Sequence, residues 1–222
     1  IKFIWPLDGR GARKLLQIPT WLRDLMASVI LVHAMSMRPI VRFPDPQLRR
    51  RSVELGEVDD DVRQLVADMA ETMVGAEGAG LAAIQVAVPV RLFIVDGHVA
   101  GGDEGAPPRV FINPEIVEIS EEAQTGDEGC LSFPGIFVPV KRGLRARVRA
   151  LDLEGNPFEA EGEGLYARAL QHETDHLNGR LLIDQVGPVK REIIKRKLRK
   201  EAEAERLDAA EREPARTARS AG

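Results

Sequence analysis

The chain of 222 residues is 44% hydrophobic and 30% charged, which is typical of a globular protein and excludes a disordered or fibrous one. This length allows one domain with a buried core, or a compact domain with tails. The net charge of −4 argues against attraction of the whole protein to nucleic acid, so no specific nucleic-acid sequence is expected as a partner. No segment approaches the roughly 20 apolar residues of a membrane span, so no membrane partner is expected either.

The cysteine content bears on the compartment and on the chemistry. Cys130 is the only cysteine, so an intramolecular disulfide is excluded. This fits a reducing compartment, and we expect a cytoplasmic protein. A single cysteine is also a candidate for catalysis or metal ligation, to be weighed against inert packing in the core.

Residues 1–34 precede the globular pattern, which begins at the stretch RPIVRFPDP. An apolar segment, LMASVILVHAM, follows several basic residues, but no strong cleavage site comes after it, so a targeting peptide is the less favoured interpretation. We interpret residues 1–34 as an extension outside the fold, with Met35 or Met37 as the more natural start. The main domain is predicted to span residues 35–188.

The first predicted element is a helix that begins at Asp59 or Asp60 and ends near Val74. Its apolar residues follow helical spacing, and Gly75 provides the stop signal. The glycine-rich stretch GAEGAGLAAIQV then forms a turn that leads into a short apolar segment. Residues 90–96 are predicted to form a strand, and residues 97–108 a loop.

The second half of the chain alternates between strand and helix signals. Residues 109–120 are predicted to form a pair of strands interrupted at Asn113 and Pro114. Residues 144–164 alternate apolar with charged side chains around Gly155, which indicates a half-exposed antiparallel hairpin. A helix follows over residues 165–178, and Gly179 stands where a left-handed stop is favoured. Strands in the middle with helices before and after favour an α+β fold.

The C-terminal region is dominated by charge. Between residues 190 and 200, seven basic residues accompany one acid, Glu192: Lys190, Arg191, Lys195, Arg196, Lys197, Arg199 and Lys200. Acidic residues then return, so we predict an exposed charged helix over residues 189–213 and a flexible tail over residues 214–222.

The stretch QHETDHLNG carries the strongest chemical signal. On a helix, His172 and His176 lie one turn apart on the same face, so both imidazoles can reach one ion. Glu173 then lies near enough to exchange protons with water at that ion without ligating it, as in the H-E-x-x-H pattern of metallohydrolases. A chance meeting of these residues on an exposed face is the weaker interpretation.

The third ligand is not given by this stretch. A long metalloprotease pattern is excluded, because Leu182 stands where it requires a histidine. A downstream glutamate such as Glu192 is conceivable, but it belongs to the charged tail. Cys130 is the better candidate, since a tight glycine-flanked loop brings its backbone close and a thiolate with two imidazoles leaves one position open.

Three stretches resemble the signature motifs of the peptide deformylase family. They are GAGLAAIQ (residues 78–85), EGCLS (residues 128–132) and QHETDH (residues 171–176), in the family's order and at similar spacing. The similarity extends from about residue 38 to residue 188. It implies an α+β fold of the bacterial type, in which antiparallel strands pack around a central helix that carries H-E-x-x-H, with an N-terminal and a C-terminal helix. It also implies hydrolysis of the formyl group from the N-terminal methionine of nascent polypeptides, which releases formate.

The resemblance assigns roles at the metal and at the reacting group. Cys130, His172 and His176 would hold one divalent ion. Glu173 would act as general base and then as the acid that protonates the leaving amine. The side chain of Gln85 and the backbone N–H of Leu131 would donate to the formyl oxygen. The family uses Fe²⁺, which we favour in the cell, and Zn²⁺, Ni²⁺ or Co²⁺ are possible.

The resemblance also covers substrate contacts and departures from the pattern. Gly80, Ala79 and Gly129 would contact formyl-methionyl peptides, and Glu128 would pair with Arg142 to brace the cysteine loop. Ala79 stands where the family usually carries valine or isoleucine, which predicts an altered methionine pocket. Ala87 replaces a common glycine and is expected to have no consequence.

Phe137 and the basic C-terminal helix bear on the binding partners. Phe137 stands where some relatives carry an arginine, which would remove one contact to the peptide. The basic helix resembles the segment by which bacterial deformylases dock on the ribosome, a hypothesis that stands against a merely solvated helix. Two rival functions remain at this point: another H-E-x-x-H amidase or peptidase, and a ribosome-associated binding module without activity.

Overall fold

The computed structural model describes the backbone of residues 37–220 and the side chains of residues 37–207. The interpretation of residues 1–34 as an extension therefore falls outside the described residues. The elements are the helices α2 (Asp60–Gly75), α3 (Gly164–Leu177) and α4 (Pro188–Ser220), the 3-10 helices η1 (Pro46–Arg49), η2 (Ala83–Val86) and η3 (Leu182–Gln185), and the strands β1 (Gly80–Ala82), β2 (Leu92–Val95), β3 (Arg109–Ile119), β4 (Ala123–Cys130), β5 (Phe133–Gly143), β6 (Arg145–Leu151) and β7 (Pro157–Glu163).

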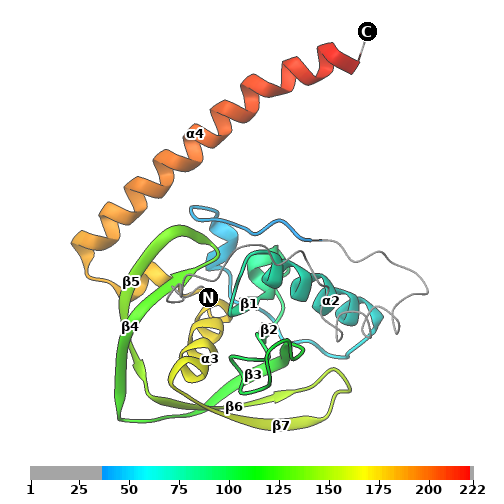
Figure 1. Cartoon of the computed structure of the whole chain (residues 1–222), viewed down its shortest axis with the longest axis vertical. Coiled ribbons are helices and arrows are strands. Elements are labelled where there is room, and N and C mark those ends of the chain that lie inside the picture. Colours follow the sequence, from blue (N-terminus) through cyan, green and yellow to red (C-terminus); the bar gives the residue numbers. More distant parts are fainter. Residues whose placement is uncertain (1–36, 221–222) are drawn as a thin grey trace.

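Two antiparallel sheets surround helix α3, as Figure 1 shows. The larger sheet has five strands in the order β1-β2-β3-β6-β7. Strands β4 and β5 lie between β3 and β6 in the chain and pair only with each other, as a long hairpin that reaches toward α3. This arrangement confirms the predicted α+β fold with antiparallel strands around a central helix.

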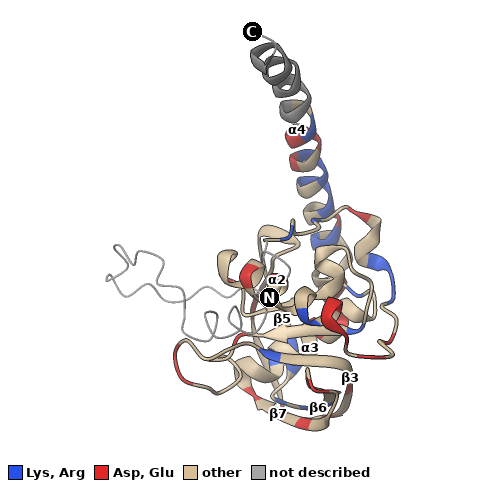
Figure 2. Ribbon diagram, turned by 90° about the vertical axis from the view of Figure 1, so that its right-hand side faces the viewer, with Lys and Arg blue, Asp and Glu red and all other residues tan. Residues whose placement is uncertain are grey.

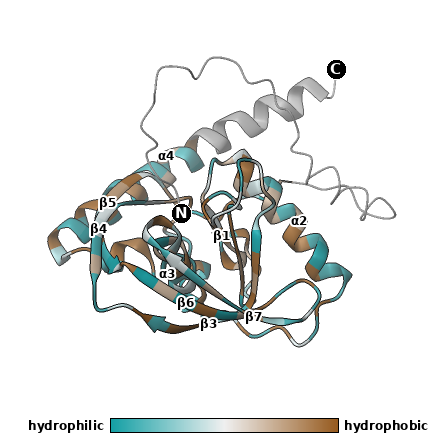
Figure 3. Cartoon of the chain, turned by 60° about the horizontal axis from the view of Figure 1, so that its bottom comes forward, coloured by the Kyte–Doolittle hydropathy of each residue, from teal (hydrophilic) through white to brown (hydrophobic). Residues whose placement is uncertain are grey.

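Helix α3 is buried because it fills the space between the sheets. Its residues Ala169, Leu170 and Leu177 join the core that it shares with β2, β3 and β6, where the rings of Phe93 and Phe111 stack 4.7 Å apart. Strands β6 and β7 alternate buried with exposed side chains. Figure 3 shows hydrophilic and hydrophobic residues mixed along these strands. The sheet therefore presents its apolar face to the helix that carries the two histidines.

The helix boundaries follow local signals in the sequence. The Asp59 side chain accepts a hydrogen bond from the Val62 N–H and caps α2, which confirms the predicted start of this helix. After α3, Gly179 has a φ of 71°, and a Cβ there would lie 2.5 Å from the carbonyl oxygen of Arg49. Only glycine fits that position, which confirms the predicted left-handed stop.

The structure corrects the strand assignment in two places. Residues 109–120 do not form a pair of strands: β3 is one continuous strand, and Asn113, with a φ of 49°, marks an irregularity in its pairing with β6. The β4–β5 hairpin was missed entirely, because glycines and charged residues in β4 obscure the alternation that identifies a strand. Cys130 consequently ends a strand instead of lying in a tight loop.

The structure also corrects the expectation for Ala87. It follows η2 with a φ of 65°, in the left-handed region that favours glycine. An alanine in this conformation costs about 1 kcal/mol relative to an ordinary backbone. The replacement of the family's glycine is therefore not without consequence, contrary to our expectation.

Helix α4 extends away from the body of the molecule (Figure 1). It begins at Pro188 and continues to Ser220, beyond the predicted helix end at residue 213. The flexibility expected of residues 214–222 stays a prediction. Within residues 37–220, no helix is both long and apolar enough to span a bilayer.

Candidate metal centre and active site

Three potential metal ligands converge between the hairpin and the central helix. Cys130 comes from the end of β4, and His172 and His176 come from successive turns of α3. Each offers one ligand atom, and these atoms all lie within 4.8 Å of one another. The Cys130 Sγ is 3.2 Å from Nε2 of His176, and all three residues are buried. The sequence prediction that these residues share one site is consistent with this geometry.

The donor set fits a divalent transition metal. Nδ1 of His172 lies 3.0 Å from Glu128, while its Nε2 is buried and has no hydrogen-bond partner among the described residues. A buried ring nitrogen without a partner is costly unless an ion accepts its lone pair. One thiolate and two imidazoles suit zinc and ferrous iron alike, so the ligand chemistry leaves the metal's identity open.

A bulge aims the cysteine at the two histidines. The pairing of β4 with β5 is regular up to Gly129 and Phe137, and then shifts so that Cys130 pairs with Phe133. Such a bulge turns a side chain out of its regular direction. Gly129 is buried at this step, directly before the ligand, and Leu131 follows it half-buried. The glycine and the bulge together explain how a strand end can deliver a metal ligand.

Glu173 lies beside this group and against strand β1. It is fully buried on α3, and a Cβ added to Gly80 would lie 2.7 Å from its Oε1. The absence of a side chain at residue 80 is therefore what allows β1 and the carboxylate to approach. This close approach puts the predicted substrate contact Gly80 next to the predicted base. Ala79 precedes it, half-buried against the core around α3.

The amide of Gln85 is held in one orientation. Its Oε1 accepts a hydrogen bond of 2.9 Å from the backbone N–H of Ala82, and its Nε2 donates to the Ser132 Oγ at 3.1 Å. The same Nε2 lies 3.6 Å from the Cys130 Sγ. Gln85 is fully buried in η2, so its N–H groups face the metal ligands and its oxygen faces away.

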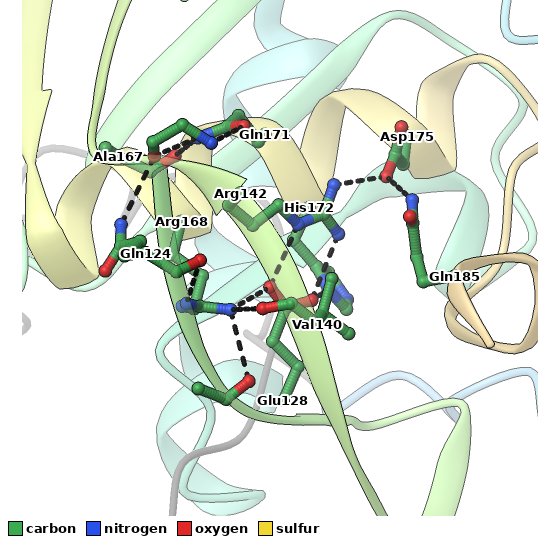
Figure 4. Close-up of polar contacts among 12 residues, drawn as sticks. Gln124, Glu128, Val140, Arg142, Ala167, Arg168, Gln171, His172, Asp175 and Gln185 are labelled. Atoms are coloured by element: carbon green, nitrogen blue, oxygen red, sulfur yellow. Dashed lines mark hydrogen bonds and ion pairs between the residues drawn. The ribbon is translucent and has the colours of Figure 1, made fainter. Parts of the chain in front are cut away.

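A polar cluster centred on Glu128 supports the ligands from behind (Figure 4). Arg142 donates to both carboxylate oxygens of Glu128, at 2.9 and 3.0 Å, so the predicted pair of these two residues is present. Arg168 donates to one of the same oxygens at 2.8 Å. Arg142 also contacts Asp175 at 2.6 Å, and Gln185 donates to Asp175 in turn.

The burial of this cluster changes how its members titrate. Burial by itself would raise the pKa of Glu128, but hydrogen bonds from His172 and Arg142 lower it far below its usual range. For His172, burial lowers the pKa, whereas the neighbouring Cys130 and Glu128 raise it to about 9. Burial lowers the pKa of His176 well below its ordinary value, and His172 adds to that effect. Glu128 is therefore a carboxylate at any physiological pH.

A cavity of about 220 Å³ opens next to the ligands. Its walls are made by Ile40, Arg42 and Ala76 together with residues 130–131 and 133–137. Phe137, which stands where some relatives carry an arginine, is one of the lining residues. Most of the lining residues carry apolar side chains, and Arg42 is the one basic residue among them.

Sequence reasoning assigned no role to three residues of this region: Ser132, Arg168 and Asp175. Ser132 and Asp175 lie inside the motifs that were identified, but only the structure shows that they contact Gln85 and Arg142. Arg168 offered a signal of its own. It lies about one helical turn before His172, between Ala167 and Ala169. It is therefore a charged residue in a part of the helix that is otherwise apolar.

A buried Cys-His-His group with a carboxylate on the same helix, held between antiparallel sheets, defines a metal-dependent hydrolase. Comparisons with known proteins identify the family within this class of enzymes. A family profile described as "Polypeptide deformylase" matches residues 37–192. The peptide deformylases of Cellvibrio japonicus and Alkalilimnicola ehrlichii are 48% and 50% identical to this chain, over 77% and 75% of its length and 98% and 91% of theirs. The chain belongs to the polypeptide deformylase family.

Solved structures agree with this assignment. The crystal structure of peptide deformylase from Ehrlichia chaffeensis in complex with actinonin has a TM-score of 0.70 and 41% identity, and the match covers 75% of this chain and 98% of that one. A Met-Ala-Ser-bound peptide deformylase from Acinetobacter baumannii has a TM-score of 0.63 and 32% identity, and the match covers 69% of this chain and 100% of that one.

Proposed function

We propose that this protein removes the formyl group from the N-terminal methionine of nascent polypeptides and releases formate. The observation that carries this proposal is the convergence of Cys130, His172 and His176 beside the buried Glu173, in a member of the polypeptide deformylase family. These three ligands would hold one divalent cation, which would activate water as the nucleophile at neutral pH and polarise the formyl oxygen.

Glu173 moves the proton in this reaction. As general base it takes a proton from the attacking water, and as general acid it gives a proton to the nitrogen of the leaving amine when the C–N bond breaks. A positioned carboxylate that acts in this way typically contributes a factor of about 10² to 10⁴ in rate. The close packing of Glu173 against Gly80 supports this role, because it fixes the carboxylate at the edge of the strand that would contact the peptide.

Gln85 and the backbone N–H of Leu131 would donate to the formyl oxygen as it becomes negatively charged. Preoriented donors of this kind are worth about 3 kcal/mol each in the transition state. The orientation of Gln85 supports this role, since Ala82 holds its oxygen and leaves the N–H groups facing the site. A neutral amide also avoids adding a second positive charge next to the cation.

The substrate peptide would lie between β1 and the cavity. Gly80 would pair with its backbone, Ala79 and Gly129 would contact the methionine residue, and the following residues would enter the cavity lined by Leu131 and Phe137. The Met-Ala-Ser peptide bound to the Acinetobacter baumannii relative supports recognition of a short N-terminal sequence that begins with methionine. Small Ala79 predicts a wider methionine pocket than valine or isoleucine would give.

The decisive assay measures formate released from formyl-Met-Ala. Wild-type protein should release formate and leave internal peptide bonds intact. Glu173→Ala should lose at least about 10²-fold in kcat while retaining its metal, whereas the exposed Glu154→Ala should match wild type. Cleavage of internal peptide bonds without formate release would show that the protein is another kind of amidase. Metal binding without any turnover would favour a binding module.

The native cation is the next part of the proposal. Fe²⁺ is favoured in the cytoplasm, with Zn²⁺, Ni²⁺ or Co²⁺ as substitutes, because the donor set accepts all of these ions. Anaerobic purification followed by metal analysis should find iron in the active preparation. Full activity in a preparation that contains only zinc would contradict this choice.

We also propose that α4 contacts the ribosome through its basic face. Figure 2 shows lysine and arginine residues along the part of α4 that leaves the body. Arg191 contacts the carbonyl oxygens of Ile183, Asp184 and Val186, so it serves the fold. Lys190, Arg196, Arg199 and Lys200 are exposed and available for phosphates.

A charge-matched comparison tests the ribosome contact without removing the helix. Replacement of Arg196, Arg199 and Lys200 by glutamine should weaken co-sedimentation with ribosomes and reduce its dependence on salt. The control replaces Arg145, Arg147 and Arg149, three arginines of β6 whose side chains are about half exposed, by glutamine and changes the net charge equally. Equal binding by both triple variants would rule out a specific contact through α4.

A further inference from the structure

Arg168 is a buried arginine that contacts the support of the metal centre but lies outside the recognised motifs. It is 4% exposed and stands on α3, one turn before His172. Its Nη1 lies 2.8 Å from Oε1 of Glu128 and 3.0 Å from the carbonyl oxygen of Val140 on β5. It also donates to the carbonyl oxygen of Gly126 at 3.3 Å. The side chain therefore ties the central helix to both strands of the hairpin that delivers Cys130.

The contacts of Glu128 are divided between its two oxygens (Figure 4). Oε1 accepts from Nε of Arg142 and Nη1 of Arg168. Oε2 accepts from Nη2 of Arg142 and lies 3.0 Å from Nδ1 of His172. An ionised carboxylate offers about four acceptor positions, so all of them are used. With Arg142 alone, Oε1 would keep one position open.

We propose that Arg168 is a positioning residue of the metal centre: it locks the Glu128 carboxylate in the rotation that accepts from His172 Nδ1, and so keeps His172 Nε2 directed at the ion. The inference rests on the proposed metal centre and adds to it a second arginine, contributed by the helix that carries the histidines. A hydrogen bond to one ring nitrogen of a histidine fixes both its tautomer and its orientation.

The position of Arg168 makes this coupling direct. Because Arg168 and His172 are four residues apart on one helix, they approach Glu128 from the same side of the hairpin. Arg142 approaches from β5 and is also held by Asp175. The carboxylate is therefore clamped between the helix and the sheet. Loss of Arg168 opens one acceptor position on Oε1, and loss of Arg142 opens one position on each oxygen. Loss of partners behind a ligating histidine typically weakens metal binding by about 10- to 100-fold.

The test uses the full chain loaded with Co²⁺ and measures how fast a chelator removes the ion. Arg168→Met should lose Co²⁺ about 10- to 100-fold faster than wild type, with altered visible absorption bands of the bound cobalt. Arg168→Lys keeps the buried charge with a single nitrogen, costs less to folding, and should fall between the two. Leu65→Ala on the remote helix α2 provides a variant of lowered stability and should release Co²⁺ at the wild-type rate.

A double-mutant cycle decides whether Arg168 acts through Glu128. If it does, Arg168→Met combined with Glu128→Gln should lose Co²⁺ no faster than Glu128→Gln alone. Multiplication of the two effects would overturn the inference, as would a wild-type rate in Arg168→Met or accelerated loss in Leu65→Ala. A wild-type protein that takes up no Co²⁺ would instead refute the proposed metal centre itself.

Discussion

Helices α3 and α4 both carry many charged residues, but they hold them in opposite environments. On α3, Arg168, His172 and Glu173 are buried between the two sheets, and the arginine and the histidine have fixed polar partners. On α4, most charged residues of the described part face outward, although Arg191 contacts backbone carbonyls of the body. Among the residues of α4 whose side chains are described, Ile194 and Leu198 are the buried ones. In Figure 2, α4 projects from the body with charged positions along it, whereas α3 lies within the body.

The difference shows where a charge determines structure and where it does not. A buried ionised group must be matched in place by hydrogen bonds and opposite charge, so each member of the Glu128 cluster constrains the others. An exposed charge is screened by water and salt, and its exact position matters little. The attachment of α4 should therefore depend on Ile194, Leu198 and the backbone contacts of Arg191, and not on its exposed charges.

The largest effect on stability is expected at the centre of the buried cluster. Glu128→Gln removes the negative charge between Arg142 and Arg168 and leaves both buried guanidinium groups without it. Breaking a buried pair in this way costs about 3–5 kcal/mol. Urea unfolding of the metal-free protein at pH 7 should show this loss, whereas the exposed Glu161→Gln should remain within about 0.5 kcal/mol of wild type.

The pH dependence of that loss identifies its origin. The pKa of Glu128 is lower in the folded protein than its ordinary value of 4.5, so the folded state binds fewer protons there than the unfolded state. The stabilisation is fully present above pH 4.5 and decreases as the pH falls below it. The difference between wild type and Glu128→Gln should shrink accordingly in acid. A difference that stays constant from pH 7 to pH 3 would mean that the charge of Glu128 is not the cause.

A smaller effect is expected where α4 meets the body. Leu198 is 3% exposed and packs with Leu182, Ile183 and Ile194. Leu198→Ala should cost about 2 kcal/mol, at the low end for a buried leucine, because the helix can shift into the space. Ile193 lies on the same helix but is 64% exposed, so Ile193→Ala should change the unfolding free energy little. Equal losses in the two variants would show that the packing of Leu198 is not what attaches α4.

The contrast between the helices also explains what the sequence could and could not predict. The ends of α2 and α3, the two histidines and Glu173 follow from local signals: a capping aspartate, apolar spacing and a glycine stop. The β4–β5 hairpin pairs residues up to 20 positions apart, from Ala123 with Gly143 inward. The clamp on Glu128 depends on partners that are 14 to 44 residues away in sequence. Periodicity carries no information on such pairings, so the resemblance to a family supplied the Glu128–Arg142 pair and left Arg168 unnoticed.

The smallest effect is expected on the exposed face of α4. Nζ of Lys197 lies 3.8 Å from Oε1 of Glu201, one turn later, and each side chain is about half exposed. Such a pair contributes about 0.3–0.5 kcal/mol at low salt, and alanine's higher helix propensity offsets part of its loss. Lys197→Ala should therefore leave the melting temperature unchanged within error at 0.5 M salt and lower it only slightly at low salt. A loss as large as that of Leu198→Ala would mean that exposed charge, too, attaches α4, and the distinction drawn between the two helices would fail.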